Sequence, residues 1–185
     1  MATQPRTFLT PEQYLEIERA AEFRSEYLNG EMFAMSGATA RHNSIVNTIG
    51  REIYPDIKGR CQYFTTDLRL LIPATGLYTY PDLMVICGPV EFEGDRQDIV
   101  RNPRFIIEVL SPSTANYDRG EKFLHYRSIP TLYDYLVVAQ ESVHVEHYTR
   151  QTDNSWLLRE YTSLADTVRI ASVGANITLA AVYDV

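Results

Sequence analysis

Hydrophobic and polar positions along the chain follow two periods. Residues 104–110, RFIIEVL, are apolar on both faces of a strand, which is the pattern of a central strand covered on both sides. Between residues 41 and 54, isoleucine and valine recur at steps of three and four, which predicts an amphipathic helix that ends near Pro55. The chain therefore combines helices with buried strands.

Capping and turn signals place the other elements. Thr10, Pro11 and Gln13 form the start signal of a helix over about 11–21, and Asn29-Gly30 predicts a hairpin. Further strands are predicted at 62–72, 80–87, 132–150 and 155–161, a charged loop at 88–103, a break at Ser111-Pro112-Ser113, and a helix at about 117–128. No repeat or linker interrupts this order, so we expect one mixed α/β (α+β) domain over residues 1–185.

Composition is that of an ordinary globular protein, with 45% hydrophobic and 22% charged residues. The chain has no run of about 18 apolar residues, and its first residues lack the apolar core of a secretory signal. We therefore expect a cytoplasmic protein with no membrane partner. Cys61 and Cys87 lack CxxC spacing, so the sequence predicts buried thiols, with neither a disulfide framework nor a zinc site.

The formal charge of -7 argues against a surface made for non-specific nucleic-acid binding, because phosphate contacts need cations. A local basic groove remains compatible with that charge. Candidates for it are Arg41, Arg51, Lys58, Arg60, Arg119 and Arg127. Only Lys58 and Lys122 are lysines, and the other cationic residues are arginines.

Two carboxylates stand out because they occur in apolar strands. Glu108 lies inside FIIEVL, and Asp82 follows Pro81 at the start of the apolar run LMVIC. A buried carboxylate needs a cation or several donors, so Glu108 is either paired with an arginine or part of a site. For Asp82, a simple Pro-Asp turn before the strand is a common alternative. If the two strands are neighbours, the carboxylates converge, and a hard divalent ion such as Mg²⁺ is the cation they would hold.

Lys122 is the third candidate, on the predicted helix after the Glu108 strand. Asp118 lies four residues before it on the same helix face, so a local ion pair is one interpretation. A compact ammonium also suits contact with a phosphate oxygen or an attacking water better than a planar guanidinium does. The rarity of lysine in this chain favours the second interpretation.

These residues resemble a known family. Pro81-Asp82, Glu108 within IEVLSPST, and Asp118 with Lys122 are similar to the restriction endonuclease family known as Uma-two, in the PD-(D/E)XK nuclease superfamily. The resemblance covers almost the whole chain. It implies a restriction-endonuclease-like core, in which a central mixed sheet is flanked by helices, and it implies a homodimer.

The same resemblance implies roles for single residues. Asp82 and Glu108 would be metal ligands, and Glu31 would be an additional acidic residue near the site, although a surface charge on the hairpin explains Glu31 equally well. The superfamily's usual lysine position, two residues after the acidic ligand, is Leu110 here, so Lys122 would supply that lysine from the helix. His42 either lines the same cleft or has a structural role.

The sequence thus leads to one principal hypothesis, a metal-dependent endonuclease that hydrolyses phosphodiester bonds in DNA. Mg²⁺ or Mn²⁺ would be held by Asp82, Glu108 and the carbonyl of Val109, with Lys122 beside it. One alternative is a catalytically inactive nuclease-like module that binds nucleic acid or a protein. Another is a metal-dependent hydrolase of small phosphoesters, whose activity should depend little on salt.

Overall fold

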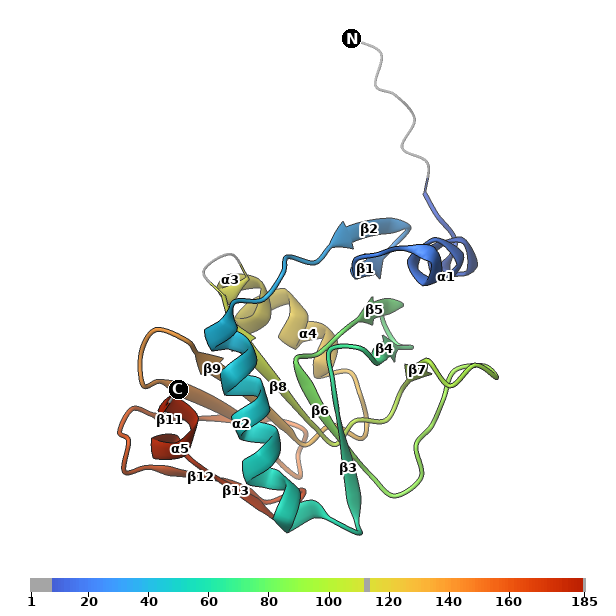
Figure 1. Cartoon of the computed structure of the whole chain (residues 1–185). Helices are drawn as coiled ribbons and strands as arrows, with labels where there is room; N and C mark the ends of the chain where they lie inside the picture. The colour runs from blue at the N-terminus through green and yellow to red at the C-terminus, as the bar shows by residue number, and fades with distance from the viewer. Residues whose placement is uncertain (1–7, 112–113, 185) are drawn as a thin grey trace.

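The computed structural model describes residues 8–111 and 114–184, in which helices pack on both faces of a large mixed sheet (Figure 1). The predicted break at Ser111-Pro112-Ser113 therefore lies partly outside the described residues. In spatial order the large sheet contains β11 (Trp156–Tyr161), β10 (Val145–Arg150), β9 (Asp134–Ala139), β8 (Phe105–Leu110), β6 (Leu83–Cys87) and β3 (Cys61–Thr65). Strands β8 and β9 are parallel, and the other neighbouring pairs are antiparallel.

Strand β8 lies in the middle of this sheet, and all six of its residues are buried, as its sequence predicts. Helix α2 (Ala40–Ile57) covers one face and packs Ile45, Ile49 and Ile53 against the apolar side chains of β6 and β8 (Figure 1). It begins at Ala40, close to the predicted residue 41, and the Thr39 side chain caps it by accepting a hydrogen bond from the His42 backbone at 3.1 Å. It continues past Pro55, because Ile57 is buried in the same core.

The other face of the sheet carries the predicted helix of residues 117–128. The structure resolves it into α3 (Ala115–Tyr117), a π-helical turn η1 (Asp118–Lys122) and α4 (Phe123–Tyr126). Phe123 and Tyr126 pack on Tyr135 and Val137 of β9 in a second core cluster. Single π-turns within helices are frequent at functional sites. The turn widens the helix where Asp118 and Lys122 point inward, and both are buried.

A smaller sheet lies beside the first and contains the predicted hairpin (Figure 1). Its strands, in spatial order, are β2 (Glu31–Ala34), β1 (Ser25–Leu28), β5 (Leu77–Thr79), β4 (Arg69–Ile72) and β7 (Ile99–Val100). Asn29 and Gly30 form the turn with φ of 51° and 89°, as the sequence indicates. Helix α1 (Pro11–Ala20) starts with the predicted capping box and packs Tyr14 on this sheet.

Two expectations about the strands change in detail. The segment 62–72 forms two strands, β3 and β4, which belong to different sheets, and the loop 88–103 contains the short strand β7. At the C-terminus, β12 (Thr167–Ile170) and β13 (Ala175–Thr178) form a hairpin followed by α5 (Leu179–Tyr183), and both β13 and α5 pack against α2. The family-like core of a sheet with helices on both faces is unaffected.

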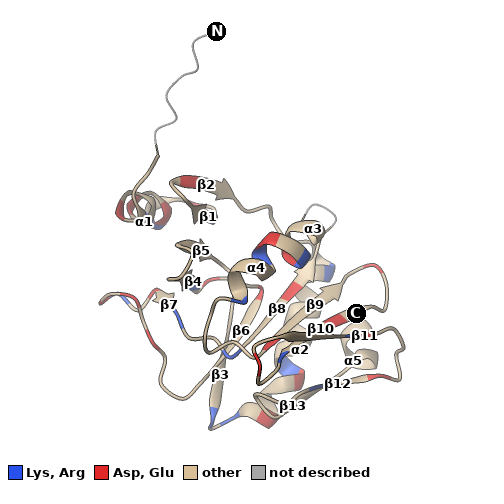
Figure 2. Cartoon of the chain, turned by 180° about the vertical axis from the view of Figure 1, so that it is seen from behind, with Lys and Arg blue, Asp and Glu red and all other residues tan. Residues whose placement is uncertain are grey.

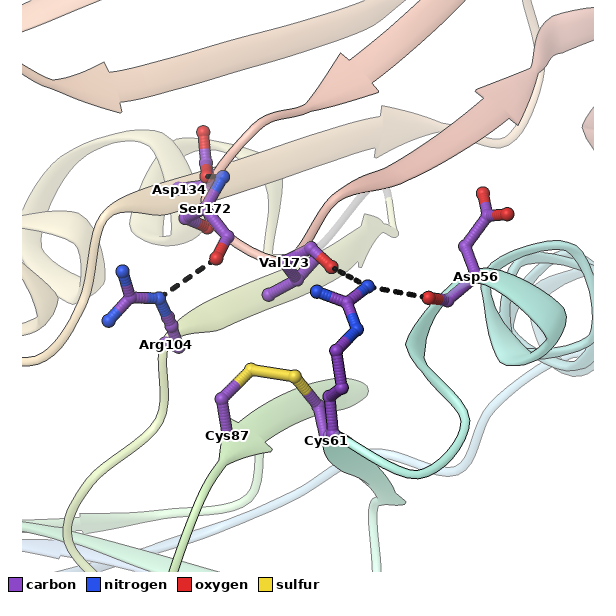
Figure 3. The surroundings of a disulfide bond; sticks show 8 residues. Asp56, Cys61, Cys87, Arg104, Asp134, Ser172 and Val173 are labelled. Atoms are coloured by element: carbon purple, nitrogen blue, oxygen red, sulfur yellow. Dashed lines mark hydrogen bonds between the residues drawn. A yellow bond between two sulfur atoms is a disulfide. The ribbon is translucent and has the colours of Figure 1, made fainter.

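The prediction of free thiols at Cys61 and Cys87 is wrong. The two residues are paired directly across β3 and β6, and their sulfur atoms form a disulfide (Figure 3). Two cysteines that lack a CxxC motif and lie 26 residues apart gave no sign of this register. Around the disulfide, Arg60 donates to the carbonyls of Asp56 and Val173, and Arg104 donates to that of Ser172.

Candidate active site

Asp82 and Glu108 lie together at one end of the large sheet. Strand β6 pairs with β8 in the register Leu83↔Ile107, and continuing that register places Asp82 opposite Glu108. The Asp82 backbone nitrogen is 3.4 Å from Glu108 Oε2. The two strands are neighbours, so the condition on which convergence of the carboxylates depended is met.

The Asp82 carboxylate is held by two donors. Its Oδ2 accepts the backbone N–H of Val109 at 2.7 Å and lies 3.0 Å from His42 Nε2, which reaches it from the first turn of α2. Burial acts to lower the pKa of His42, but the hydrogen bond and charge of Asp82 and a hydrogen bond to the Val109 backbone outweigh it, so this pKa is raised. These contacts fix the orientation of Asp82.

Glu108 is bound from the helical side. Its Oε1 lies 2.9 Å from Lys122 Nζ and accepts the hydroxyl of Tyr126 at 2.6 Å. Tyr126 follows Lys122 by one helical turn, so both side chains project from the same face towards β8. Seen from behind, the helix between the labels α3 and α4 shows acidic and basic segments next to each other (Figure 2).

Lys122 also contacts two other carboxylates. Glu26 Oε1 on β1 lies 3.3 Å from its Nζ, and Asp118 Oδ1 lies 3.7 Å away. The predicted i, i+4 pair with Asp118 therefore exists, but Glu108 is closer to the ammonium. Glu26 is anchored in turn by the hydroxyls of Thr79 and Tyr117.

Glu26 was missed by sequence reasoning, which chose Glu31 from the same hairpin. Glu26 is buried, whereas Glu31 is half-buried on β2, where it lies opposite Leu28 in the register of the hairpin. A signal was present, because strand alternation places Glu26 on the same side as Leu28, which packs in the core cluster of α4. The hairpin turn was easier to recognise than the core-facing side of its first strand.

The site contains more acids than bases. Four carboxylates, those of Glu26, Asp82, Glu108 and Asp118, meet two groups that can be cationic, Lys122 and His42, and all six residues are at most 8% exposed. Burial raises the pKa of Glu108 well above its usual value; Lys122 opposes this, while Asp82 and Asp118 add to it. Burial likewise raises the pKa of Asp118. Such an excess of buried negative charge is stabilised by an added cation.

Lys122 remains charged in these surroundings. Burial by itself would lower the pKa of its ammonium, but Glu108, Tyr126, Glu26 and Asp118 together raise this pKa well above the usual value. The ammonium is thus a fixed positive charge at the end of β8, which suits contact with an anionic substrate.

The donor set fits a hard divalent ion held partly by water. Among residues 8–111 and 114–184, no three His, Cys, Asp or Glu side chains form a ready metal cluster. Asp82 Oδ2 and Glu108 Oε1 are engaged by close protein donors, and Glu108 Oε2 accepts the Asp82 N–H at the longer distance of 3.4 Å. A carboxylate oxygen has two lone pairs, so Glu108 Oε2 can still serve as a ligand, as can Asp82 Oδ1. One or two carboxylates with several waters is the usual arrangement for Mg²⁺.

Comparison with known proteins identifies the family of this chain. Residues 11–181 match the family Uma2, whose description is "Putative restriction endonuclease". The chain belongs to the Uma2 family. It is 40% identical over 162 residues to the uncharacterized protein sll1609 of Synechocystis sp., covering 86% of this chain and 91% of that protein. A second Synechocystis protein, slr1290, is 34% identical over 176 residues, covering 95% and 91%.

A solved structure supports the fold. The crystal structure of an Anabaena variabilis protein, described as "a putative nuclease belonging to DUF820", superposes with a TM-score of 0.77 at 19% identity, covering 95% of this chain and 97% of that one. The Uma2 chain therefore has the restriction-endonuclease-like fold expected from its sequence. No helix in its described part is both long and apolar enough to cross a bilayer.

The other sequence candidates are spread over the Uma2 fold. Leu110, at the usual lysine position, packs in the core cluster of α4. Val109 was a candidate through its carbonyl, but it contacts a carboxylate of the site through its N–H, which donates a hydrogen bond to Asp82. Of the candidate groove cations, Arg119 pairs with Glu146 at 2.6 Å, and Arg60 donates to backbone carbonyls. These two are engaged within the protein.

Proposed function

We propose that this chain is a metal-dependent endonuclease that hydrolyses phosphodiester bonds in DNA. Its membership of Uma2 and its fold support a nuclease. The observation that carries the proposal is the convergence of Asp82 and Glu108 from paired strands, with Lys122 Nζ 2.9 Å from Glu108. Mg²⁺ or Mn²⁺ would be held by Asp82 and Glu108, and the Val109 carbonyl is a further candidate ligand.

Each residue then has a distinct role. A bound divalent ion supplies Lewis acidity towards the phosphate and acidifies water. Val109 N–H and His42 keep the Asp82 carboxylate in one orientation, which reduces the entropy lost when ligands are assembled. Lys122 offsets negative charge that develops on the phosphate, and Glu26 and Asp118 hold its ammonium in place.

Cleavage of labelled DNA with Mg²⁺ or Mn²⁺ tests the proposal. Asp82→Asn and Glu108→Gln preserve shape but remove the charge that binds the cation, so cleavage should fall by at least about a hundredfold. Asp67→Asn is the matched control, because Asp67 is an exposed carboxylate paired only with Arg24 among the described residues. Equal cleavage by wild type and Asp82→Asn would reveal a contaminant and remove the enzymatic claim.

A second candidate is the catalytically inactive module that binds nucleic acid or a protein. It is favoured by Leu110 at the usual lysine position and by the three carboxylates that already engage Lys122. Calorimetric titration with Mg²⁺ separates the two. An enzyme of the proposed kind should bind Mg²⁺ and be stabilised by about 2.7 kcal/mol at a hundredfold excess over Kd, and Asp82→Asn should abolish both effects.

The proposal includes the homodimer that the family resemblance implies. Two copies would double the phosphate contacts of an acidic protein whose non-specific affinity is expected to be modest. The molar mass measured in solution by light scattering tests this part, and a monomeric mass at concentrations that support cleavage would contradict it.

A further inference from the structure

A surface pocket lies at the C-terminal end of α4, next to the hairpin of β10 and β11. Its lining residues are Leu124, Arg127, Ser128, Arg150, Asn154 and Trp156. None of them is acidic, although the chain has 24 acidic and 17 basic residues. Figure 2 shows α4 beside β10 and β11 on this side of the molecule.

Two guanidinium groups of the pocket rest on aromatic rings. The Arg127 guanidinium carbon is 5.2 Å from the centre of the Phe123 ring, and that of Arg150 is 5.0 Å from the Trp156 ring. Phe123 and Trp156 contact each other edge to face at 5.2 Å. The rings fix the two cations at low cost in side-chain entropy and thus prepare a positively charged surface.

Neither arginine has a carboxylate partner among the described residues. Arg150 donates to the backbone carbonyls of Arg127 and Pro130, just after α4. Both acceptors are uncharged, so the positive charge of Arg150 is not balanced by them. Burial lowers its pKa, which is the direction expected for a cation without a counter-ion. Nearby acids are engaged elsewhere, because Glu146 binds Arg119 and Asp153 accepts hydrogen bonds from Ser155.

The pocket is joined to the candidate active site by one layer of rings. Phe123 stacks on Tyr135 at 5.0 Å, and the Tyr135 hydroxyl donates to the Asp118 carbonyl at 3.0 Å. Along the helix, Lys122 and Arg127 are five residues apart, a rise of about 7.5 Å. The same five residues turn the helix by about 140°, so Lys122 points towards Glu108 of β8 and Arg127 leaves the helix on another side. One nucleotide spans about 3.4 Å along a duplex strand, so a strand that passes around the end of α4 would bring a later phosphate to Arg127.

We propose that this pocket binds a backbone phosphate of the nucleic-acid strand whose scissile phosphate lies at Glu108 and Lys122. The proposal rests on the proposed nuclease function and adds a second contact to it. Arg127 donates to the phosphate, Asn154 supplies an uncharged donor, and Arg150 adds positive charge. A phosphate contact positions the strand without reading its sequence.

The chain provides its own reporter for this pocket, because Trp156 is its single tryptophan. A fluorescein-labelled DNA duplex is titrated into the full chain in EDTA, and both label anisotropy and Trp156 emission are recorded. Trp156 emission should change in parallel with binding. Arg127→Ala should weaken binding about five- to tenfold and reduce the slope of log K against log salt by about 1.

Arg159→Ala is the matched control. Arg159 lies on β11 three residues after Trp156, is exposed, and projects from the opposite face of the strand, so its loss should leave affinity, salt slope and emission change as in wild type. Urea unfolding checks that Arg127→Ala remains folded.

Two results would overturn the proposal. If anisotropy reports DNA binding while Trp156 emission stays constant and Arg127→Ala binds like wild type, the pocket is not a phosphate site, and the nuclease proposal stands. Alternatively, poly-glutamate changes Trp156 emission through Arg127 while DNA does not; the pocket then belongs to an acidic protein partner.

Discussion

The two ends of the large sheet both bury carboxylates, but they balance charge in opposite ways. Strands β6 and β8 run antiparallel, so Asp82 and Glu108 share one end, while Cys87 and Phe105 lie towards the other. At the second end, Asp134 Oδ1 is 2.7 Å from His147 Nε2, and its Oδ2 accepts the Ser172 N–H. The disulfide between Cys61 and Cys87 lies near Asp134 and Ser172 at this end (Figure 3).

The difference lies in the ratio of acids to bases. At the Asp134 end, one carboxylate faces one imidazole, and both of its oxygens have protein donors. At the Asp82 end, four carboxylates share one ammonium and one imidazole. Removing one partner of a matched buried ion pair destabilises the fold, because the other partner is left buried without its counter-charge. A group of carboxylates with too few cations is instead stabilised when a further cation binds to it. Charge imbalance, rather than burial, is what distinguishes the proposed binding site from the structural pair.

The largest expected effect is that a substitution at one end lowers mainly stability, whereas a substitution at the other end lowers mainly cleavage. Asp134→Asn should lower the free energy of unfolding by about 3 kcal/mol, because it breaks a buried pair, while cleavage per folded molecule persists. Asp82→Asn should cost less stability than Asp134→Asn, since the asparagine oxygen still accepts from Val109 and the loss of repulsion with Glu108 offsets the weaker contact with His42. Urea unfolding and cleavage assays measure both quantities. Loss of stability in Asp82→Asn equal to that in Asp134→Asn would remove the contrast.

The disulfide offers a slightly smaller test of the same contrast. Its reduction should lower the free energy of unfolding by about 2 to 3 kcal/mol, because the unfolded chain regains the freedom of the closed loop. The double variant Cys61→Ala/Cys87→Ala is the control and should no longer respond to reductant. Because the bond joins the end of β6 remote from Asp82, Mg²⁺ affinity should not change. A shift in the Mg²⁺ titration midpoint on reduction would mean that the two ends are coupled.

Sequence patterns were sufficient where one strand or helix carries its own signal. The doubly buried strand β8, the hairpin at Asn29-Gly30 and the capped start of α1 are confirmed because alternation, positive φ and capping are local properties. Local patterns left the neighbouring position of the Asp82 and Glu108 strands as a condition, and only the family resemblance implied that the two residues share a site.

What the sequence could not provide depends on contacts between distant elements. Cys61 and Cys87 become partners only through the register of β3 and β6. Glu26 reaches Lys122 only because the small sheet packs beside the η1 turn, and no local pattern encodes that distance. The assignment of Lys122 came from the rarity of lysine and from the family, and its catalytic role stays a prediction.

The smallest effect is expected from an ion pair that belongs to neither end. Arg19 Nε on α1 binds Asp98 Oδ2 at 2.8 Å, and both side chains are about one-third exposed. The hydrogen bond from Arg19 lowers the pKa of Asp98 below its ordinary value of 3.8. A lowered pKa gives stability that is complete above the ordinary value and is lost as pH falls through the folded-state value.

Solvent screening should limit this contribution to less than about 1 kcal/mol. Urea unfolding of wild type and Asp98→Asn at neutral pH, and again well below pH 3.8, measures it. Wild type should be the more stable protein at neutral pH, and the two should converge in acid, because protonated aspartic acid and asparagine are then both uncharged. The difference in the free energy of unfolding could instead widen in acid, or exceed the loss caused by Asp134→Asn. Exposure to solvent would then not determine how much an ion pair contributes, and the contrast between the two buried ends would need an explanation other than charge balance.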